Sequence, residues 1–263
     1  MCLLVVAIDP LPGVRFVMAA NRDEAHERPT APAHVWPAAP EVTAGLDLRA
    51  GGTWMGVTSA GRLAAITNVR DPSARREGRS RGDLPRRFLT GAGDASFQAS
   101  AIAEIAASYP AFNLFAGDSD RAFYITEAGA PRELEAGIYG VSNARLDVPW
   151  PKLRSAKTAM REAVARAGRV EVEALFAMLR DETPVPDAEL PSTGVPLEVE
   201  RLLATPFIRN ERYGTRASTV AIVFREGPPF FEERSFGPDG GPKVTEGHSV
   251  RRFGSPPAGF ALG

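Results

Sequence analysis

Two short apolar runs separated by a turn open the chain. Residues 3–8 are uninterrupted apolar sequence, residues 9–13 contain the turn formers Pro and Gly, and residues 16–20 form the second run. Runs of this length are typical of buried strands and are too short to span a membrane. The pattern predicts a β-hairpin whose second strand ends in the charged sequence Asn21-Arg22-Asp23-Glu24.

Downstream, apolar runs and turn residues predict further elements. The proline-rich stretch 30–48 is expected to be irregular, because proline cannot donate a ladder hydrogen bond, and 183–194 to be a long loop. Helical spacing predicts helices over 84–89, 94–109, 152–167, 170–180 and 196–203. Strands are predicted over 51–58 and 62–69 as a second hairpin, then over 112–116, 122–126, 137–142, 220–224, 230–235 and 242–248.

This order of elements indicates the fold class. Hairpins come first, helices lie in the middle and strands end the chain, which favours an α+β sandwich of stacked antiparallel sheets with helices outside. The two successive helices over 152–180 are expected to cover one face of a sheet. No internal repeat or change in composition divides the chain, so a single domain over residues 1–263 is predicted.

Composition excludes several function classes. The 31 Lys and Arg balance 32 Asp and Glu, so no basic surface for nucleic acid is indicated. One Cys excludes a disulfide framework, and the scattered His26, His34 and His248 share no metal-ligand spacing, so no metal site is predicted. Without a secretory signal or a transmembrane segment, a cytoplasmic protein is expected. The sequence does not indicate the oligomeric state.

Cys2 becomes the first residue if Met1 is removed. A thiolate is a good nucleophile, and a free α-amine, with a pKa of about 7.7–8.0, can act as its general base near neutral pH. One residue would then supply both nucleophile and base. The alternative is that Cys2 is a small apolar residue at the start of a buried strand.

Residues 70–87 contain seven arginines and no lysine (Arg70, Arg75, Arg76, Arg79, Arg81, Arg86 and Arg87). Charge runs are usually solvated surface, which is one interpretation of this stretch. The other is an anion-binding surface, because the planar guanidinium matches carboxylate and phosphate groups better than an ammonium does.

Several short motifs, taken together and in order, resemble one known family. The chain is identified as a member of the NRDE-motif family, also called the transport and Golgi organisation family. The motifs are Met1-Cys2, Asn21-Arg22-Asp23-Glu24, Gly52-Thr53-Trp54-Met55-Gly56, Thr67-Asn68-Val69, Ser80-Arg81-Gly82-Asp83-Leu84, Ser142-Asn143 with 147–152, and Tyr213-Gly214-Thr215-Arg216. The resemblance implies the four-layer αββα sandwich of N-terminal nucleophile hydrolases of the choloylglycine and penicillin V acylase type.

That resemblance also implies roles for individual residues. Cys2 would be the nucleophile, Arg22 would stabilise its thiolate and Asp23 would orient the amine. Asn68 and Asn143 would be oxyanion or substrate donors, and Arg216 would complete the electrostatics. Asn21, Glu24, Trp54 and Arg81 are the candidate ligand-binding residues, although burial alone would account for Trp54, and ion pairs with nearby arginines would account for Asp23 and Glu24.

One feature departs from the acylase pattern. In the acylases residues intervene between the Arg and the Asp, whereas Arg22 and Asp23 are adjacent here. Side chains alternate along a strand, so Asn21 and Asp23 are expected on one face and Arg22 and Glu24 on the other, unless a bulge intervenes.

The sequence therefore leaves two functions open. The first is an amide-bond hydrolase that uses Cys2. The second is a non-catalytic carrier, because the family has been associated with haem trafficking and with the handling of acyl-CoA or lipid. In both cases the expected partner is a small anionic molecule, namely an amide substrate, haem or acyl-CoA. No resident cofactor is expected, and haem enters only as a carried ligand.

Overall fold

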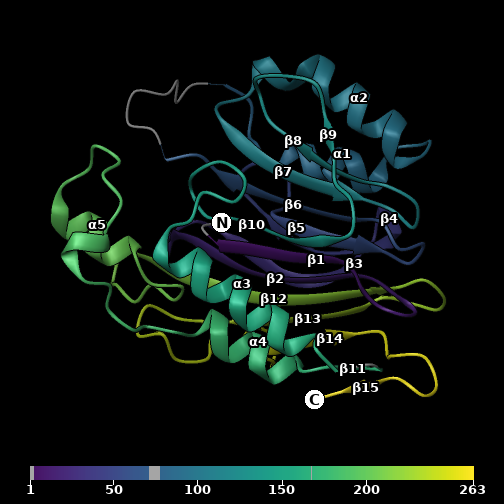
Figure 1. The fold of residues 1–263 in the computed structure, drawn as a ribbon. Helices are drawn as coiled ribbons and strands as arrows, with labels where there is room; N and C mark the ends of the chain where they lie inside the picture. Colours follow the sequence, from purple (N-terminus) through teal and green to yellow (C-terminus); the bar gives the residue numbers. More distant parts are fainter. Residues whose placement is uncertain (1–2, 71–77, 167) are drawn as a thin grey trace.

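Two antiparallel sheets stacked face to face form the centre of the protein (Figure 1). The computed structural model describes residues 3–70, 78–166 and 168–263. The six-stranded sheet has the order β10 (Gly137–Val141), β1 (Leu3–Leu11), β2 (Val14–Ala25), β12 (Tyr213–Phe224), β13 (Phe230–Ser235) and β14 (Val250–Phe253). The seven-stranded sheet has the order β3 (Thr30–Trp36), β4 (Ala39–Asp47), β5 (Met55–Thr58), β6 (Leu63–Asn68), β7 (Phe112–Gly117), β8 (Ala122–Ile125) and β9 (Arg132–Glu133).

Helices cover the outer face of each sheet. Figure 1 shows α1 (Asp83–Thr90) and α2 (Ala95–Ile105) over the seven-stranded sheet, and α3 (Pro151–Ala163) and α4 (Val172–Leu179) over the six-stranded sheet. A shorter helix, α5 (Leu197–Leu203), lies to one side, and β11 (Arg169–Val170) pairs in parallel with β15 (Ala261–Leu262). This arrangement confirms the predicted αββα sandwich.

Strand β1 explains why the first apolar run is unbroken. Leu3 and Val5 pack against α3 and α4, whereas Leu4 and Val6 pack between the two sheets. A third apolar cluster lies between the seven-stranded sheet and helices α1 and α2. Because β1 is buried on both faces, it shows no alternation of apolar and polar residues.

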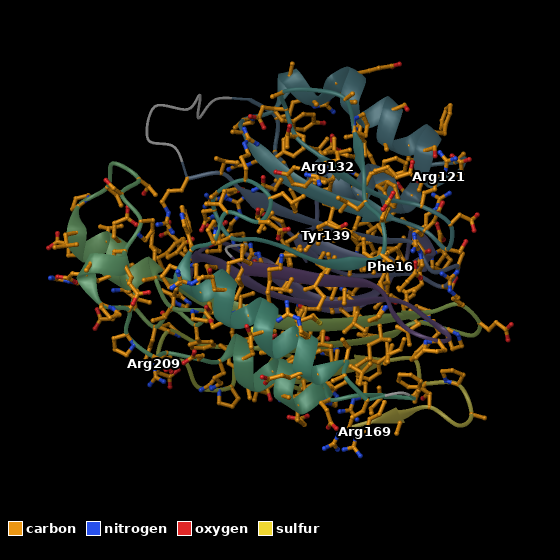
Figure 2. The ribbon with its side chains drawn as sticks, viewed as in Figure 1. Phe16, Arg121, Arg132, Tyr139, Arg169 and Arg209 are labelled. Atoms are coloured by element: carbon orange, nitrogen blue, oxygen red, sulfur yellow. The ribbon has the colours of Figure 1, made fainter. Side chains whose placement is uncertain are left out.

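Phe16 illustrates the packing between the sheets. Its ring is fully buried and meets the Phe115 ring edge to face, with centroids 5.6 Å apart. In Figure 2 Phe16 lies inside the sandwich, whereas Arg121 and Arg209 project from its surface. The apolar run 16–20 therefore contributes to the interior, as its composition predicted.

The structure corrects three of the predicted elements. Residues 30–48 are not irregular, because they form β3 and β4; Pro32 is tolerated since β3 is an edge strand. Residues 242–248 form only isolated bridges, and β14 begins after them. Strand β12 begins at Tyr213 rather than 220, because its polar first half pairs with β2 and, from Ala217 onward, also with β13.

The predicted helices mostly agree with the structure. Asp94 caps α2 as expected, with its carboxylate accepting the Phe97 backbone N–H at 2.8 Å. The predicted helix 152–167 ends earlier, at Ala163, and its last predicted residue lies outside the described residues. Over the described ranges, no helix is both long and apolar enough to span a bilayer.

Gly52 holds the segment 78–82 against the start of β5. The Thr53 backbone N–H donates to the Gly82 carbonyl at 3.0 Å. A Cβ added at Gly52 would lie 2.4 Å from the carbonyl carbon of Gly82, which is closer than real Cβ contacts allow. The backbone segments can therefore approach only because residue 52 has no side chain.

We predict that Gly52→Ala displaces the segment 78–82. Trypsin should then cleave after Arg79 and Arg81 several-fold faster than in the wild type, because the displaced segment loses its backbone bond to Thr53. Time-resolved proteolysis with mass spectrometry measures these cleavages. Gly129→Ala is the matched control, since a Cβ there meets nothing within 4 Å. Equal cleavage rates in the two variants would contradict the prediction.

Candidate binding site between the two sheets

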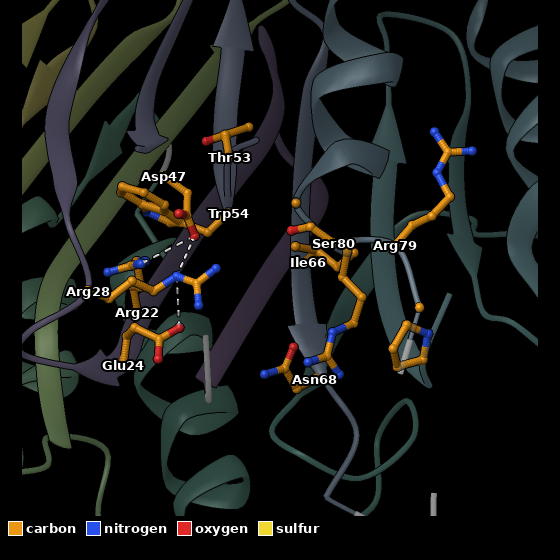
Figure 3. A pocket seen from close by; sticks show the side chains of 14 residues that line it. Arg22, Glu24, Arg28, Asp47, Thr53, Trp54, Ile66, Asn68, Arg79 and Ser80 are labelled. Carbon is orange, nitrogen blue, oxygen red and sulfur yellow. Dashed lines mark hydrogen bonds and ion pairs between the residues drawn. The ribbon is translucent and has the colours of Figure 1, made fainter. Parts of the chain in front are cut away.

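A cavity of about 370 Å³ lies where the end of β2 meets strands β4 to β6 (Figure 3). Four arginines and two carboxylates contribute to its walls, so the cavity carries an excess of positive charge. We call it the arginine-lined cavity. Its lining residues are Arg22, Glu24, Arg28, Asp47, Thr53, Trp54, Ile66, Asn68, Gly78, Arg79, Ser80, Arg81, Gly82 and Pro110.

Arg22 is the most deeply buried of these arginines. Its guanidinium carbon lies 4.4 Å from the centroid of the Trp54 ring, a cation–π contact, and its Nη2 atom lies 3.9 Å from Oδ2 of Asp47. Its Nη1 atom has no hydrogen-bond partner among the described residues. Burial lowers the pKa of Arg22 from its usual value, but a guanidinium stays charged near neutral pH. The site therefore holds a desolvated cation with one terminal nitrogen, Nη1, that is free to donate hydrogen bonds.

The carboxylates of the cavity compensate mainly Arg28. Nε of Arg28 lies 2.7 Å from Oδ2 of Asp47 and 3.7 Å from Oε2 of Glu24 (Figure 3). Asp47 also accepts the backbone N–H groups of Arg49 and Ala50. The ion-pair interpretation of Glu24 therefore has a structural counterpart, although Glu24 also lines the cavity.

Arg81 and Arg79 form the opposite wall. Arg81 donates to the Ala111 carbonyl at 3.2 Å, and no carboxylate of the described residues lies within 4 Å of its guanidinium. Burial lowers its pKa. Arg79 pairs with Asp83 at 2.9 Å. Arg81 thus adds a second, half-buried cation without a close counterion, so an anionic group bound here would meet charge that the protein itself does not neutralise.

Strand alternation divides the sequence Asn21 to Glu24 between two faces of β2, as predicted. Arg22 and Glu24 line the cavity, whereas Asn21 and Asp23 face the outer helices. The amide of Asn21 donates to the carbonyls of Leu179 and Pro206. Asp23 accepts from the Thr215 hydroxyl at 2.6 Å. The structure therefore does not place Asn21 and Asp23 at the cavity.

The two predicted asparagines are linked to each other. Asn68 lines the cavity, and Asn143 donates from Nδ2 to the Asn68 carbonyl at 3.1 Å. The Asn143 carbonyl accepts the Arg70 backbone N–H at 2.6 Å, and Arg70 in turn pairs with Glu200 of α5 at 2.8 Å. Asn143 therefore supports the backbone around Asn68, while the Asn68 side chain reaches the cavity.

Arg216 lies at a bulge in β12. The ladder pairs Thr215 with Asp23 and Ala217 with Arg22, which leaves Arg216 without an opposing residue. A bulge redirects a side chain, and Arg216 donates to the carbonyls of Ala25 and Arg28. It does not line the arginine-lined cavity but a smaller one of about 30 Å³ beside it.

This smaller cavity shares two wall residues with the first. We call it the Glu233 chamber, after its one acidic lining residue. The chamber is lined by Arg22, Thr30, Pro32, Trp54, Arg216, Ala217, Glu233, Ser235, Lys243 and Thr245. Oε1 of Glu233 accepts the Ala33 backbone N–H at 2.7 Å, and Oε2 has no partner among the described residues. Burial raises the pKa of Glu233 from 4.5 to about 7, against the opposing effects of that hydrogen bond and of the Arg22 charge.

Four residues that the sequence analysis singled out lie outside the described residues, namely Met1, Cys2, Arg75 and Arg76. Where the structure describes the chain, no group of three or more His, Cys, Asp or Glu residues could hold a metal ion. Sequence reasoning missed Arg28, Asp47 and Glu233; for Glu233 the available signal was a glutamate pair inside the apolar strand 230–235.

We predict that Glu233→Gln removes one component of the pH dependence of stability. The folded-state pKa lies above the unfolded one, so the stability that the protonated group contributes is fully present below pH 4.5 and is lost as the pH rises to about 7. At about 1.4 kcal/mol per pKa unit, the wild type loses roughly 3 kcal/mol that the variant keeps. Urea unfolding at pH 5 and pH 8 measures the difference.

The control for this prediction is Glu226→Gln, at an exposed position on the turn between β12 and β13. Its stability profile should run parallel to that of the wild type. If the Glu233→Gln profile is also parallel, Glu233 is not the group that titrates.

The sequence and the fold both match known proteins. The model of the family Transport and Golgi organisation 2 matches residues 1–238. The Transport and Golgi organization protein 2 homolog of Bos taurus is 36% identical over 258 residues, covering 89% of this chain and 93% of the bovine protein. The Homo sapiens homolog is 35% identical over 256 residues, and the Drosophila melanogaster protein is 29% identical over 261 residues, each covering 89% of this chain and 93% and 92% of its own length.

A solved structure with the same fold is the N-acylethanolamine-hydrolyzing acid amidase ortholog of Caenorhabditis elegans. Its TM-score is 0.51 at 12% sequence identity, over 86% of this chain and 98% of the nematode chain. At that identity the likeness concerns the fold alone, which agrees with the expected N-terminal nucleophile hydrolase-like sandwich. With the family model covering most of the sequence and mammalian relatives above 30% identity, the chain belongs to the Transport and Golgi organisation 2 family.

Proposed function

We propose that this protein binds a small anionic molecule in the arginine-lined cavity and hydrolyses an amide bond of that molecule with Cys2 as the nucleophile. The observation that carries the proposal is the presence of two incompletely compensated arginines in one cavity, the buried Arg22 and the half-buried Arg81. Such cations bind carboxylates or phosphates with charge-assisted hydrogen bonds.

The start of β1 supports a role for Cys2. Leu3, which follows Cys2 in the sequence, pairs with Asn21, the residue before Arg22. Leu3 and Asn21 face the outer helices, whereas Leu4 and Arg22 face the space between the sheets. The described chain thus begins beside the strand end that contributes Arg22 to the cavity. The nematode structural neighbour is named as an amide hydrolase, which makes an amide the substrate class to test first.

In the proposed reaction the Cys2 thiol loses its proton to the free α-amine, and the thiolate attacks the carbonyl carbon of the amide. The carbon–nitrogen bond then breaks, the leaving amine takes the proton, and an acyl thioester remains on Cys2. Water hydrolyses the thioester to a carboxylic acid and restores the thiol. In this scheme Asn68 donates a hydrogen bond to the oxyanion from the cavity wall. Asn143 positions Asn68 by donating from its side-chain amide to the backbone carbonyl of Asn68.

One observation favours the second candidate, a carrier of an anionic ligand such as haem or acyl-CoA. Asp23, the residue expected to orient the α-amine, faces away from the cavity; its Oδ1 atom accepts from Thr215, and its Oδ2 atom has no partner among the described residues. The arginines, by contrast, would bind an anion whether or not chemistry follows. A carrier therefore needs only the groups that line the cavity.

We predict that Cys2→Ala abolishes turnover of amide substrates, because the nucleophilic thiol is lost although the α-amine remains. Mass spectrometry of the wild type should find Met1 removed and, with an activated acyl amide, an acyl adduct on Cys2. Cys2→Ser keeps the α-amine and a weaker nucleophile, so residual slow turnover is expected there. Turnover that survives in Cys2→Ala would contradict the hydrolase assignment, whereas tight ligand binding without turnover in the wild type would favour the carrier.

We predict that Arg81→Gln weakens binding of haem and acyl-CoA about tenfold or more, because one charge-assisted hydrogen bond is lost. Titrations at low and high salt measure the two dissociation constants. Arg86→Gln is the matched control: it removes the same charge from the same arginine-rich stretch, at an exposed position outside the cavity. Equal weakening in both variants would indicate a diffuse charge effect rather than binding in the cavity.

A further inference from the structure

The Glu233 chamber contains buried polar atoms that the protein itself does not satisfy. Among the described residues, Nη1 of Arg22, Nε1 of Trp54 and Oε2 of Glu233 are buried without a hydrogen-bond partner. All three side chains line the chamber, and each is more than nine-tenths buried. Orphaned buried polar atoms are rare, and each destabilises the folded state if nothing binds it. Because all three side chains line one small space, this space is a candidate binding site for a small ligand.

The chemistry of these atoms defines the ligand. The guanidinium and indole nitrogens can only donate hydrogen bonds, so the ligand must accept at least two hydrogen bonds. Two further cations, Arg216 and Lys243, also line the chamber, against Glu233 as its one carboxyl group. A volume of about 30 Å³ is too small for a phosphate ester or a lipid headgroup and sufficient for a halide or formate ion.

We propose that the Glu233 chamber is a second binding site, which takes one small monoanion held by Nη1 of Arg22, Nε1 of Trp54 and the protonated carboxyl of Glu233. When Glu233 ionises, its carboxylate repels the anion, and a water molecule that donates to Oε2 takes the place of the anion. The site is distinct from the arginine-lined cavity, but Arg22 and Trp54 form a wall of both. An anion in the chamber would therefore bind the Nη1 atom of Arg22, which otherwise has no partner among the described residues.

The surroundings of Glu233 set the pH at which this exchange occurs. Arg22 of β2 and Arg251 of β14 face it as cations, and Arg251 lies opposite it in the ladder between β13 and β14. The Thr219 hydroxyl of β12 and the Ala33 N–H of β3 bind its carboxyl group. These groups favour the ionised form and burial opposes it more strongly, so the pKa is about 7. Anion binding should therefore weaken as the pH rises through neutrality.

The test uses the full-length protein with chloride and formate as probes and gluconate, which is too large for the chamber, as the ionic-strength control. At pH 6, chloride should raise the ratio of folded to unfolded protein by the factor one plus its concentration over its dissociation constant, which is about 11-fold at ten times that constant. At pH 8.5 its affinity should fall. No difference between chloride and gluconate at pH 6 would overturn the proposal.

Two variants test the assigned atoms. Trp54→Phe keeps a ring beneath Arg22 but removes the indole N–H, so anion affinity should fall about tenfold or more. Glu233→Gln presents a donor amide at every pH, so chloride should bind equally at pH 6 and pH 8.5. Wild-type affinity in Trp54→Phe, or wild-type pH dependence in Glu233→Gln, would each overturn the assignment.

Arg81→Gln separates this site from the proposed function. Arg81 lines the arginine-lined cavity and not the chamber, so the chloride effect should be unchanged in that variant. A chloride effect lost in Arg81→Gln would place the anion in the larger cavity and overturn the second site. The chloride titration involves no organic ligand, so its result does not depend on whether the protein hydrolyses amides or binds haem or acyl-CoA.

Discussion

The alternation of side chains along β2 is the constraint on which the site depends. β2 lies between β1 and β12 in the six-stranded sheet, and its end extends to the arginine-lined cavity. Because successive side chains point to opposite faces of the sheet, the adjacent residues Arg22 and Asp23 cannot both line the same cavity. Arg22 enters the space between the sheets, and Asp23 is bound to Thr215 on the helix side.

The burial of Arg22 is tolerated because several weak interactions replace its hydration. The Trp54 ring contributes a cation–π contact, and Asp47 and Glu24 provide negative charge at a distance. None of these interactions is a close bidentate ion pair, so the guanidinium stays available to a ligand. Arg22 lines two cavities, the larger one together with Asp47 and the chamber beside it together with Glu233. Occupancy of either site would therefore change the electrostatic potential in the other.

The sequence by itself determined the layers and part of the site. Apolar runs, turn residues and the Asp94 cap indicated most strands and helices, because these signals depend on neighbours in the chain. The separation of Arg22 from Asp23 likewise follows from the two-residue period of a strand. Strands β3 and β4 escaped prediction, because proline signals local irregularity and the edge position that accommodates Pro32 is a property of the whole sheet.

Only the tertiary structure decided which charges meet. Arg28, Asp47 and Glu233 come from separate strands and loops, and no local pattern states that they adjoin Arg22. The raised pKa of Glu233 and the unsatisfied atoms around the chamber likewise follow from burial, which depends on packing between elements distant in sequence. Residue types fix the chemistry available to a site, whereas sheet register and packing fix the distances and the desolvation that make the chemistry specific.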